Sequence, residues 1–223
     1  MDVTKNVGRR ERKLAQTRVD LAAALQARIA ERTLEEVSVR ELCDAVDISE
    51  ATFFNHFPSK ADLAVYVVQL WSVGAGWHVA AARDQGARAA IEALLDATAA
   101  EVSAHPRVMA EIIAFQARMP DKPVVREVTP LELALAFPDR AGAEALPARG
   151  LDGILPDLIE LAVTRGELPA AVDRQAAFLA LTSVFFGVPL LLGPRAPALI
   201  GPAYRQQLAI VWAGLAAPAA PAT

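Results

Sequence analysis

SEATFFNHFPSK, residues 49–60, places four aromatic rings within five positions and then continues with proline, serine and lysine. The first serine can cap a short helix, and the proline ends it because the residue before a proline is pushed out of the α conformation. Phe53 and Phe57 are four residues apart and share one helical face, so we expect them to anchor this helix in a small core. Phe54 falls on another face.

Two more helices are predicted just before this stretch. Apolar residues at helical spacing predict a helix over residues 12–31, namely Leu14, Leu21, Leu25 and Ile29. Ser38 and Glu41 form an S-x-x-E capping box that begins a second helix, and the dipeptide at residues 47–48 leaves room only for a tight turn. Three helices within fifty residues, the last two joined by a tight turn, are typical of a helix-turn-helix unit.

The segment VSVRELCDAVDISEATFFNHFPSKADL, residues 37–63, resembles the DNA-binding domain of the tetracycline-repressor (TetR) family. The resemblance covers about the first sixty residues. It implies an all-α protein with an N-terminal three-helix DNA-binding domain and a C-terminal helical domain for ligand binding and dimerisation. The chain departs from the family at Thr33, where Gly is usual, and at Phe54, where Tyr usually supplies a hydroxyl for a phosphate.

The resemblance also implies which residues approach DNA. They lie on the second and third helices and at the start of the fourth: Arg40, Ser49, Glu50, Ala51, Thr52, Phe54, Asn55, His56 and Lys60. Lys60 is expected to touch the DNA backbone as a point charge. Glu50 could accept a hydrogen bond from a cytosine amine, but a carboxylate near a helix N-terminus is also favourable by itself. His56 fits packing or a position beside a phosphate better than metal binding, because no other histidine is suitably spaced.

The distribution of charge agrees with one end docking on a polyanion. The formal net charge is −4, yet residues 1–18 carry six cations against two carboxylates. Residues 61–223 carry twelve cations against sixteen carboxylates. A basic N-terminal arm on an acidic body suits DNA binding, although a solvated tail would have the same composition.

The rest of the chain is predicted to be helical. Domains are expected at residues 1–60 (DNA binding), 61–216 (ligand binding and dimerisation) and 217–223 (a disordered tail). Helices are predicted over residues 61–83, 87–104, 107–118, from about 151 to a C-terminal glycine at 166, 173–193 and 202–215. Five prolines between residues 120 and 150 predict an irregular, partly mobile lid or crossing.

Two further sets of residues are candidates for binding. The last two helices are expected to form a dimer interface through Phe178, Leu181, Phe185, Val188 and Trp212, with burial inside a single chain as the alternative. A pocket for a small apolar effector is expected beside Trp71, Trp77, Met109, Phe115 and Arg118, where Arg118 could meet a carboxylate or phosphate. Ordinary core packing is the alternative reading of these side chains.

These features predict a ligand-responsive, homodimeric transcriptional repressor that binds a pseudo-palindromic operator through the major groove. The alternative is a small-molecule-binding or scaffolding protein of the same fold that binds DNA weakly. We expect no catalytic residues, cofactor or metal, because no paired catalytic groups or ligand clusters stand out. The single Cys43, the charged N-terminus and the interrupted apolar run at residues 176–193 favour a cytoplasmic protein without a membrane span.

Overall fold

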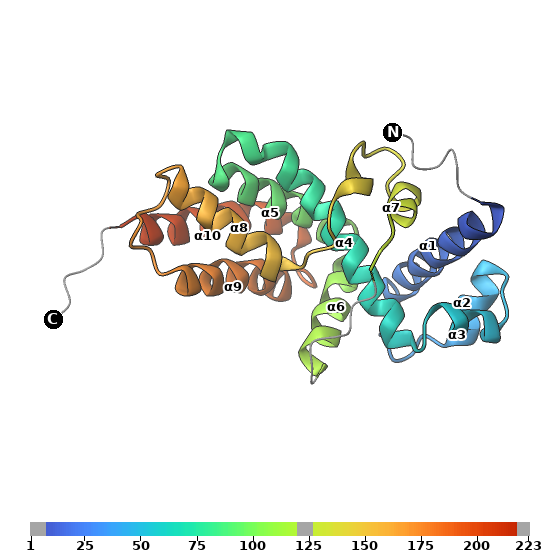
Figure 1. The fold of residues 1–223 in the computed structure, drawn as a ribbon. Helices are drawn as coiled ribbons and strands as arrows, with labels where there is room; N and C mark the ends of the chain where they lie inside the picture. The colour runs from blue at the N-terminus through green and yellow to red at the C-terminus, as the bar shows by residue number, and fades with distance from the viewer. Residues whose placement is uncertain (1–7, 120–126, 218–223) are drawn as a thin grey trace. The chain divides into compact units, whose positions relative to one another are not determined.

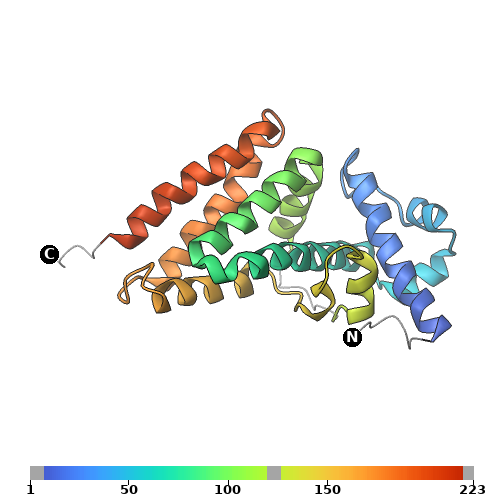
Figure 2. The same cartoon turned by 90° about the horizontal axis from the view of Figure 1, so that it is seen from above.

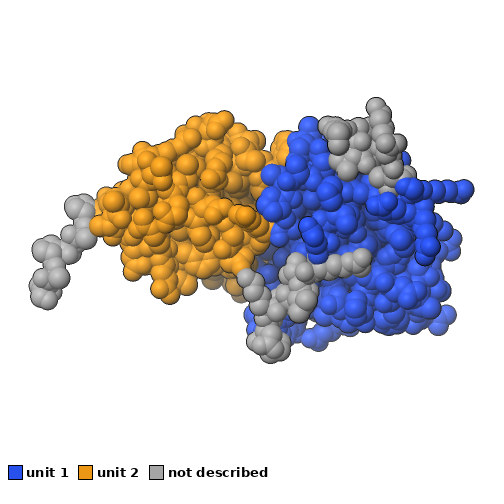
Figure 3. Space-filling view, in the orientation of Figure 1, with its two compact units in different colours: residues 1–74, 107–148 blue, residues 75–106, 149–223 orange. Residues whose placement is uncertain are grey.

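The computed structural model describes residues 8–119 and 127–217. Within these residues the chain forms ten α-helices and three short 3-10 helices and no strand, which confirms the all-α fold class (Figure 1). The chain divides into two compact units (Figure 3). Unit 1 comprises residues 1–74 and 107–148, and unit 2 comprises residues 75–106 and 149–223. The predicted tail at 218–223 and the start of the basic arm at 1–7 lie outside the described residues.

Unit 1 begins with the predicted helix-turn-helix. Its helices are α1 (Arg9–Ile29), α2 (Val39–Val46), α3 (Glu50–His56) and the first part of α4 (Lys60–Ala82). The capping box of α2 is present: the Ser38 hydroxyl accepts a bond from the Glu41 amide at 3.2 Å, and the Glu41 carboxylate accepts one from the Ser38 amide at 2.9 Å. Asp47 ends α2 with a φ of 56°, a left-handed conformation that turns the chain sharply toward α3.

The capping box makes the stability of unit 1 sensitive to acid. The backbone hydrogen bond from Ser38, followed by the hydrogen bond from the Arg32 side chain, lowers the pKa of Glu41 to about 2. Because the folded state depresses this pKa, the stabilisation is complete above the ordinary value of 4.5 and is lost as the pH falls toward 2. We therefore expect Glu41→Gln to unfold with a weaker pH dependence than the parent between pH 4.5 and 2, measured by circular dichroism. If the stability of the variant and of the parent falls equally with pH over this range, this role of Glu41 is contradicted.

The chain leaves α1 without the glycine that the family uses. The C-cap residue, Ala30, keeps a right-handed helical conformation with a φ of −66°. Among the described residues Asp47 is the one non-glycine with a positive φ, so Thr33 carries no such strain. Its amide and hydroxyl instead donate to the Glu36 carboxylate at 2.8 and 2.9 Å. The helix therefore ends in a different way, through a hydrogen-bonded turn.

The second segment of unit 1 contains a short helix within the region expected to be irregular. It holds α6 (Pro106–Arg118), α7 (Pro130–Ala136) and the 3-10 turn η2 (Ala143–Ala145), and α7 packs against α1. Thr129 and Glu132 form a capping box at the start of α7. Pro130 occupies the first helical turn, where its missing N–H costs nothing. Two of the five prolines, at 120 and 123, fall outside the described residues.

Unit 2 is a helical bundle. Its helices beyond α4 are η1 (Arg83–Gln85), α5 (Ala87–Ala104), α8 (Leu151–Thr164), α9 (Arg174–Leu192), η3 (Pro197–Leu199) and α10 (Ile200–Ala216). Helices α8 and α10 each pack on both α5 and α9 (Figure 2). The predicted glycine stop of α8 is confirmed, because Gly166 follows the helix with a φ of 72°.

Two of the described helices could cross a membrane by length and composition alone: α4 with its η1 extension, and α9. The core helix of a soluble protein meets the same criterion.

Candidate nucleic-acid interface

Helix α3 is held in place by aromatic packing. Phe53 and Phe57 are buried, as the sequence predicted, and their ring centroids lie 6.1 Å apart. Phe57 also contacts Tyr66 of α4, with a centroid distance of 5.4 Å. These rings join the buried aliphatic side chains of α1 and α2 in one core, so they fix the orientation of α3.

The opposite side of α3 is exposed. Glu50, Ala51, Phe54 and Asn55 point to solvent, and we call these four residues the reading face. The Ser49 hydroxyl caps the helix by accepting a hydrogen bond from the Thr52 amide at 3.2 Å. Arg40 is exposed on α2. The structure thus brings most of the predicted DNA-contacting residues onto or beside one exposed surface of the helix-turn-helix.

His56 differs from its predicted neighbours. Its side chain is buried at the end of α3, and its backbone carbonyl accepts a hydrogen bond from Arg18 at 3.1 Å. His56 therefore has a packing role, which is one of the two roles that the sequence allowed. A contact of the imidazole with DNA stays a prediction.

A buried arginine connects the elements around the recognition helix. The Arg18 guanidinium of α1 lies 4.5 Å from the centre of the Phe57 ring and 4.6 Å from that of Tyr66. Its Nε is 2.5 Å from the Glu132 carboxylate of α7, and the two side chains are 4% and 5% exposed. Glu132 uses its other oxygen to accept a hydrogen bond from the Thr129 amide at 2.8 Å. One ion pair therefore connects α7 to α1 and, through Arg18, to the end of α3.

The sequence reasoning missed this pair. The pattern T-P-L-E at residues 129–132 is a capping box of the same type as the one used for α2, so it could have indicated the start of α7. No local pattern indicates which distant charge Arg18 meets.

Lys60 bonds within its own chain. Its ammonium donates to the carbonyls of Leu34, Glu35 and Val37 at 2.6, 3.1 and 2.5 Å. Burial lowers the pKa of this lysine, and the nearby Glu35 and Glu41 carboxylates oppose that shift. All three donors of the ammonium are engaged with the loop between α1 and α2. A contact of Lys60 with a DNA phosphate stays a prediction, and it would compete with these three bonds.

We expect Lys60→Met to lower the free energy of unfolding by about 2 kcal/mol, because charge-assisted hydrogen bonds to three carbonyls are lost. The matched change Lys13→Met, at an exposed site on α1, should leave the unfolding free energy within about 0.5 kcal/mol of the parent. Urea unfolding measures both. If Lys60 instead contacts a phosphate, Lys60→Met lowers the salt slope of DNA binding by about one unit. If Lys60→Met leaves the unfolding free energy unchanged but lowers the salt slope of DNA binding, the structural role of Lys60 is contradicted.

The predicted effector residues are distributed over both units. Trp71, Met109 and Phe115 are half-buried in unit 1, whereas Trp77 is half-buried in unit 2. The Arg118 guanidinium lies 2.5 Å from the Glu35 carboxylate in unit 1, so a ligand anion would compete with this pair. Their role in binding an effector stays a prediction.

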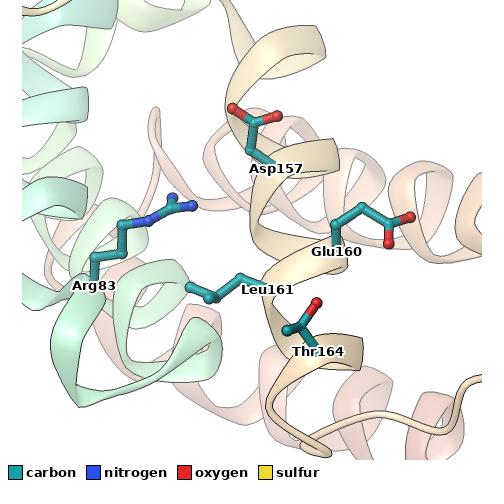
Figure 4. Close-up of a pocket in the computed structure, with 5 residues that line it drawn as sticks. All are labelled: Arg83, Asp157, Glu160, Leu161 and Thr164. Carbon is teal, nitrogen blue, oxygen red and sulfur yellow. The ribbon is translucent and has the colours of Figure 1, made fainter.

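A hollow on unit 2 has a different lining. It encloses about 420 Å³ and is lined by Arg83, Asp157, Glu160, Leu161 and Thr164 (Figure 4). Its carboxylates already have partners on the chain: Asp157 pairs with Arg149 at 2.8 Å, and Glu160 pairs with Arg174. This open, charged hollow contains none of the predicted effector residues and does not offer the apolar surroundings expected for them.

Most of the predicted dimer residues lie inside unit 2. Phe178 is half-buried, and the other four are buried within the single chain: Leu181, Phe185, Val188 and Trp212. Phe185 stacks on Tyr204 of α10 and accepts a hydrogen bond from its hydroxyl at 2.7 Å through the backbone carbonyl. These four side chains have little surface left for a partner. These four residues therefore fit burial within a single chain, which was the alternative that the sequence left open.

The same two helices also expose four large apolar side chains. Leu179, Leu190 and Leu191 of α9 are 55%, 50% and 71% exposed, and Ile210 of α10 is 59% exposed. We call these four residues the outer apolar face. Large apolar side chains exposed together on neighbouring helices are typical of an interaction surface.

Residues 21–67 match the sequence model of bacterial regulatory proteins of the tetR family. This match includes the buried rings, the reading face and both capping residues of α2 and α3. Over these residues the chain is similar to the N-terminal domain of the TetR family. The comparison with curated proteins found no match.

Solved structures extend the TetR likeness to most of the chain. The Thermus thermophilus repressor FadR, solved with lauroyl-CoA, is 18% identical, with a TM-score of 0.63 over 92% of this chain and 98% of its own. The TetR regulator TylP of Streptomyces fradiae is 20% identical, with a TM-score of 0.61 over 92% and 88%. The ketosteroid regulator of Mycobacterium tuberculosis is 18% identical, with a TM-score of 0.54 over 90% and 95%. The chain therefore has the fold of TetR-family transcriptional regulators.

Proposed function

We propose that this chain is a ligand-responsive, homodimeric transcriptional repressor that acts in the cytoplasm. The observation that carries the proposal is the exposed reading face of α3, held by buried aromatic rings within a domain of the TetR family. A helix presented in this way can enter the major groove of DNA, where base edges carry a distinguishable pattern of donors, acceptors and methyl groups. Arg40 and the basic start of α1 would supply contacts to the phosphates.

The outer apolar face is the proposed dimer interface. It lies on the same two helices as the residues first predicted, of which Leu181, Phe185, Val188 and Trp212 are buried within the single chain. A two-fold dimer would place two recognition helices about 34–36 Å apart on one side of the duplex. The operator would then be a pseudo-palindrome.

The proposed effector is a small apolar molecule. Two of the similar structures come from regulators described with lauroyl-CoA or ketosteroids, and the half-buried aromatic and methionine side chains of α4 and α6 suit an apolar ligand. The first probe to test is lauroyl-CoA, whose acyl chain is the part expected in an apolar site because its coenzyme carries phosphate groups. Binding at a hundred times its dissociation constant would stabilise the protein by about 2.7 kcal/mol, which a thermal melt detects.

DNA binding by the purified full-length protein is the decisive test. Duplexes flanking its own gene, and a pool of random duplexes, are incubated with the protein at two stated salt concentrations and separated by gel shift. The proposal expects a selected sequence with two inverted half-sites and a protected region covering both. Retention of lauroyl-CoA without binding to any duplex would support the alternative, a small-molecule-binding protein of the same fold.

A further inference from the structure

The reading face has an apolar centre. With about 100° of rotation per residue, the order of its side chains around α3 is Glu50, Phe54, Ala51 and Asn55. Phe54 and Ala51 therefore lie side by side, and a carboxylate and an amide flank them. The polar groups that usually read donors and acceptors stand at the edges of this surface.

Phe54 is exposed, but its ring is held in a defined position. Its side chain is 49% exposed, and one edge of its ring meets the buried Phe53 ring in a T-shaped contact with centroids 5.3 Å apart. Helix α3 is itself anchored through Phe53 and Phe57, so the ring has a defined position. An exposed phenyl group adds little to the stability of the domain, because much of its surface remains in water. We therefore expect the Phe54 ring to contribute to binding in a complex.

We propose that Phe54, with Ala51 beside it, reads the C5-methyl group of a pyrimidine in each operator half-site. This inference rests on the proposed DNA-binding function and adds a specificity to it. A phenyl ring has no group that can form a hydrogen bond with a phosphate or a base edge. The thymine methyl is the apolar group that B-DNA presents in the major groove, and alanine and phenylalanine are side chains that contact it. A 5-methylcytosine presents the same group.

The test removes single methyl groups from the DNA. An operator is first selected from random duplexes with the full-length protein, and each thymine is then replaced in turn by deoxyuridine. We expect one position in each half-site to bind about fourfold more weakly, the value of one methyl group taken out of its contact. At that position a 5-methylcytosine pair should bind more tightly than an unmethylated cytosine pair by a similar factor, which separates methyl reading from reading of thymine as a whole.

Protein variants assign the effect to a side chain. Phe54→Ala should keep only a small preference for the thymine duplex over the uracil duplex at that position, because Ala51 remains beside the methyl group, and the exposed site predicts a melting temperature close to the parent's. Asn55→Ala is the matched control on the same reading face, and it should bind less tightly while keeping the preference for the methyl group.

Three results would overturn the inference. The first is equal binding of thymine and uracil at every position by the parent protein. The second is tighter binding of all duplexes alike by Phe54→Tyr, because an added hydroxyl that reaches a phosphate places the ring at the DNA backbone. The third is the absence of any bound duplex, which removes the proposed function as well, whereas the first two leave that function standing.

Discussion

Glu132→Gln should lower the free energy of unfolding by about 3–5 kcal/mol, because it leaves the Arg18 charge buried without a counter-ion. Glutamine keeps the shape of the side chain and an oxygen that can still cap α7, so the change isolates the loss of charge. The Arg18 guanidinium also donates a hydrogen bond to the His56 carbonyl at the end of α3, and it lies over the Phe57 and Tyr66 rings. Denaturant unfolding followed by tyrosine and tryptophan fluorescence measures the loss.

The matched control is Glu92→Gln, which breaks the surface pair with Arg88 on α5. Exposed pairs of this kind contribute about 0–1 kcal/mol, so this variant should unfold close to the parent. The double change Arg18→Met with Glu132→Leu should recover part of the lost stability, because two apolar residues leave no buried charge unpaired. Equal, small effects of Glu132→Gln and Glu92→Gln would show that the buried pair contributes no more than a surface pair.

Leu190→Asp should convert the proposed dimer into a monomer and weaken operator binding by a factor of about a hundred or more. The change removes an apolar contact and places a charge in the interface, and a monomer can hold only one half-site. Because Leu190 is half exposed in the single chain, the melting temperature of the isolated monomer should change little. Analytical ultracentrifugation gives the mass, and gel shift at fixed salt gives the affinity.

Two comparisons sharpen this experiment. Ala100→Asp, at an exposed site of α5, should keep both the mass and the affinity of the parent. Phe185→Asp should unfold unit 2, because that side chain is buried against Tyr204. A Leu190→Asp protein with unchanged mass would place the dimer interface elsewhere on the molecule.

The helix-turn-helix could be predicted from sequence because its signals are local. The capping serines, the turn at residues 47–48 and the spacing of Phe53 and Phe57 all act within a few residues of one another. The burial of the two rings and the exposure of Phe54 followed from helical geometry alone.

Other features could not be predicted because they depend on distant parts of the chain. Helix α9 is apolar on several sides, so its periodicity does not indicate which side faces the core, and the first choice of interface residues fell on the buried side. An ammonium such as that of Lys60 suits a phosphate and a backbone carbonyl equally well from sequence. Glu132, the partner of Arg18, lies on α7, within the proline-rich region that was expected to be irregular.

The ion pair between α1 and α7 also sets an order in time during protein synthesis. Glu132 lies 114 residues after Arg18 (132 minus 18), so the ribosome needs roughly 6–23 seconds to add it at about 5–20 residues per second. Throughout that interval the nascent helix-turn-helix contains an arginine whose counter-ion does not yet exist. The helix-turn-helix is therefore completed late, although it is encoded first, because its buried arginine gains a counter-ion only when α7 has been made.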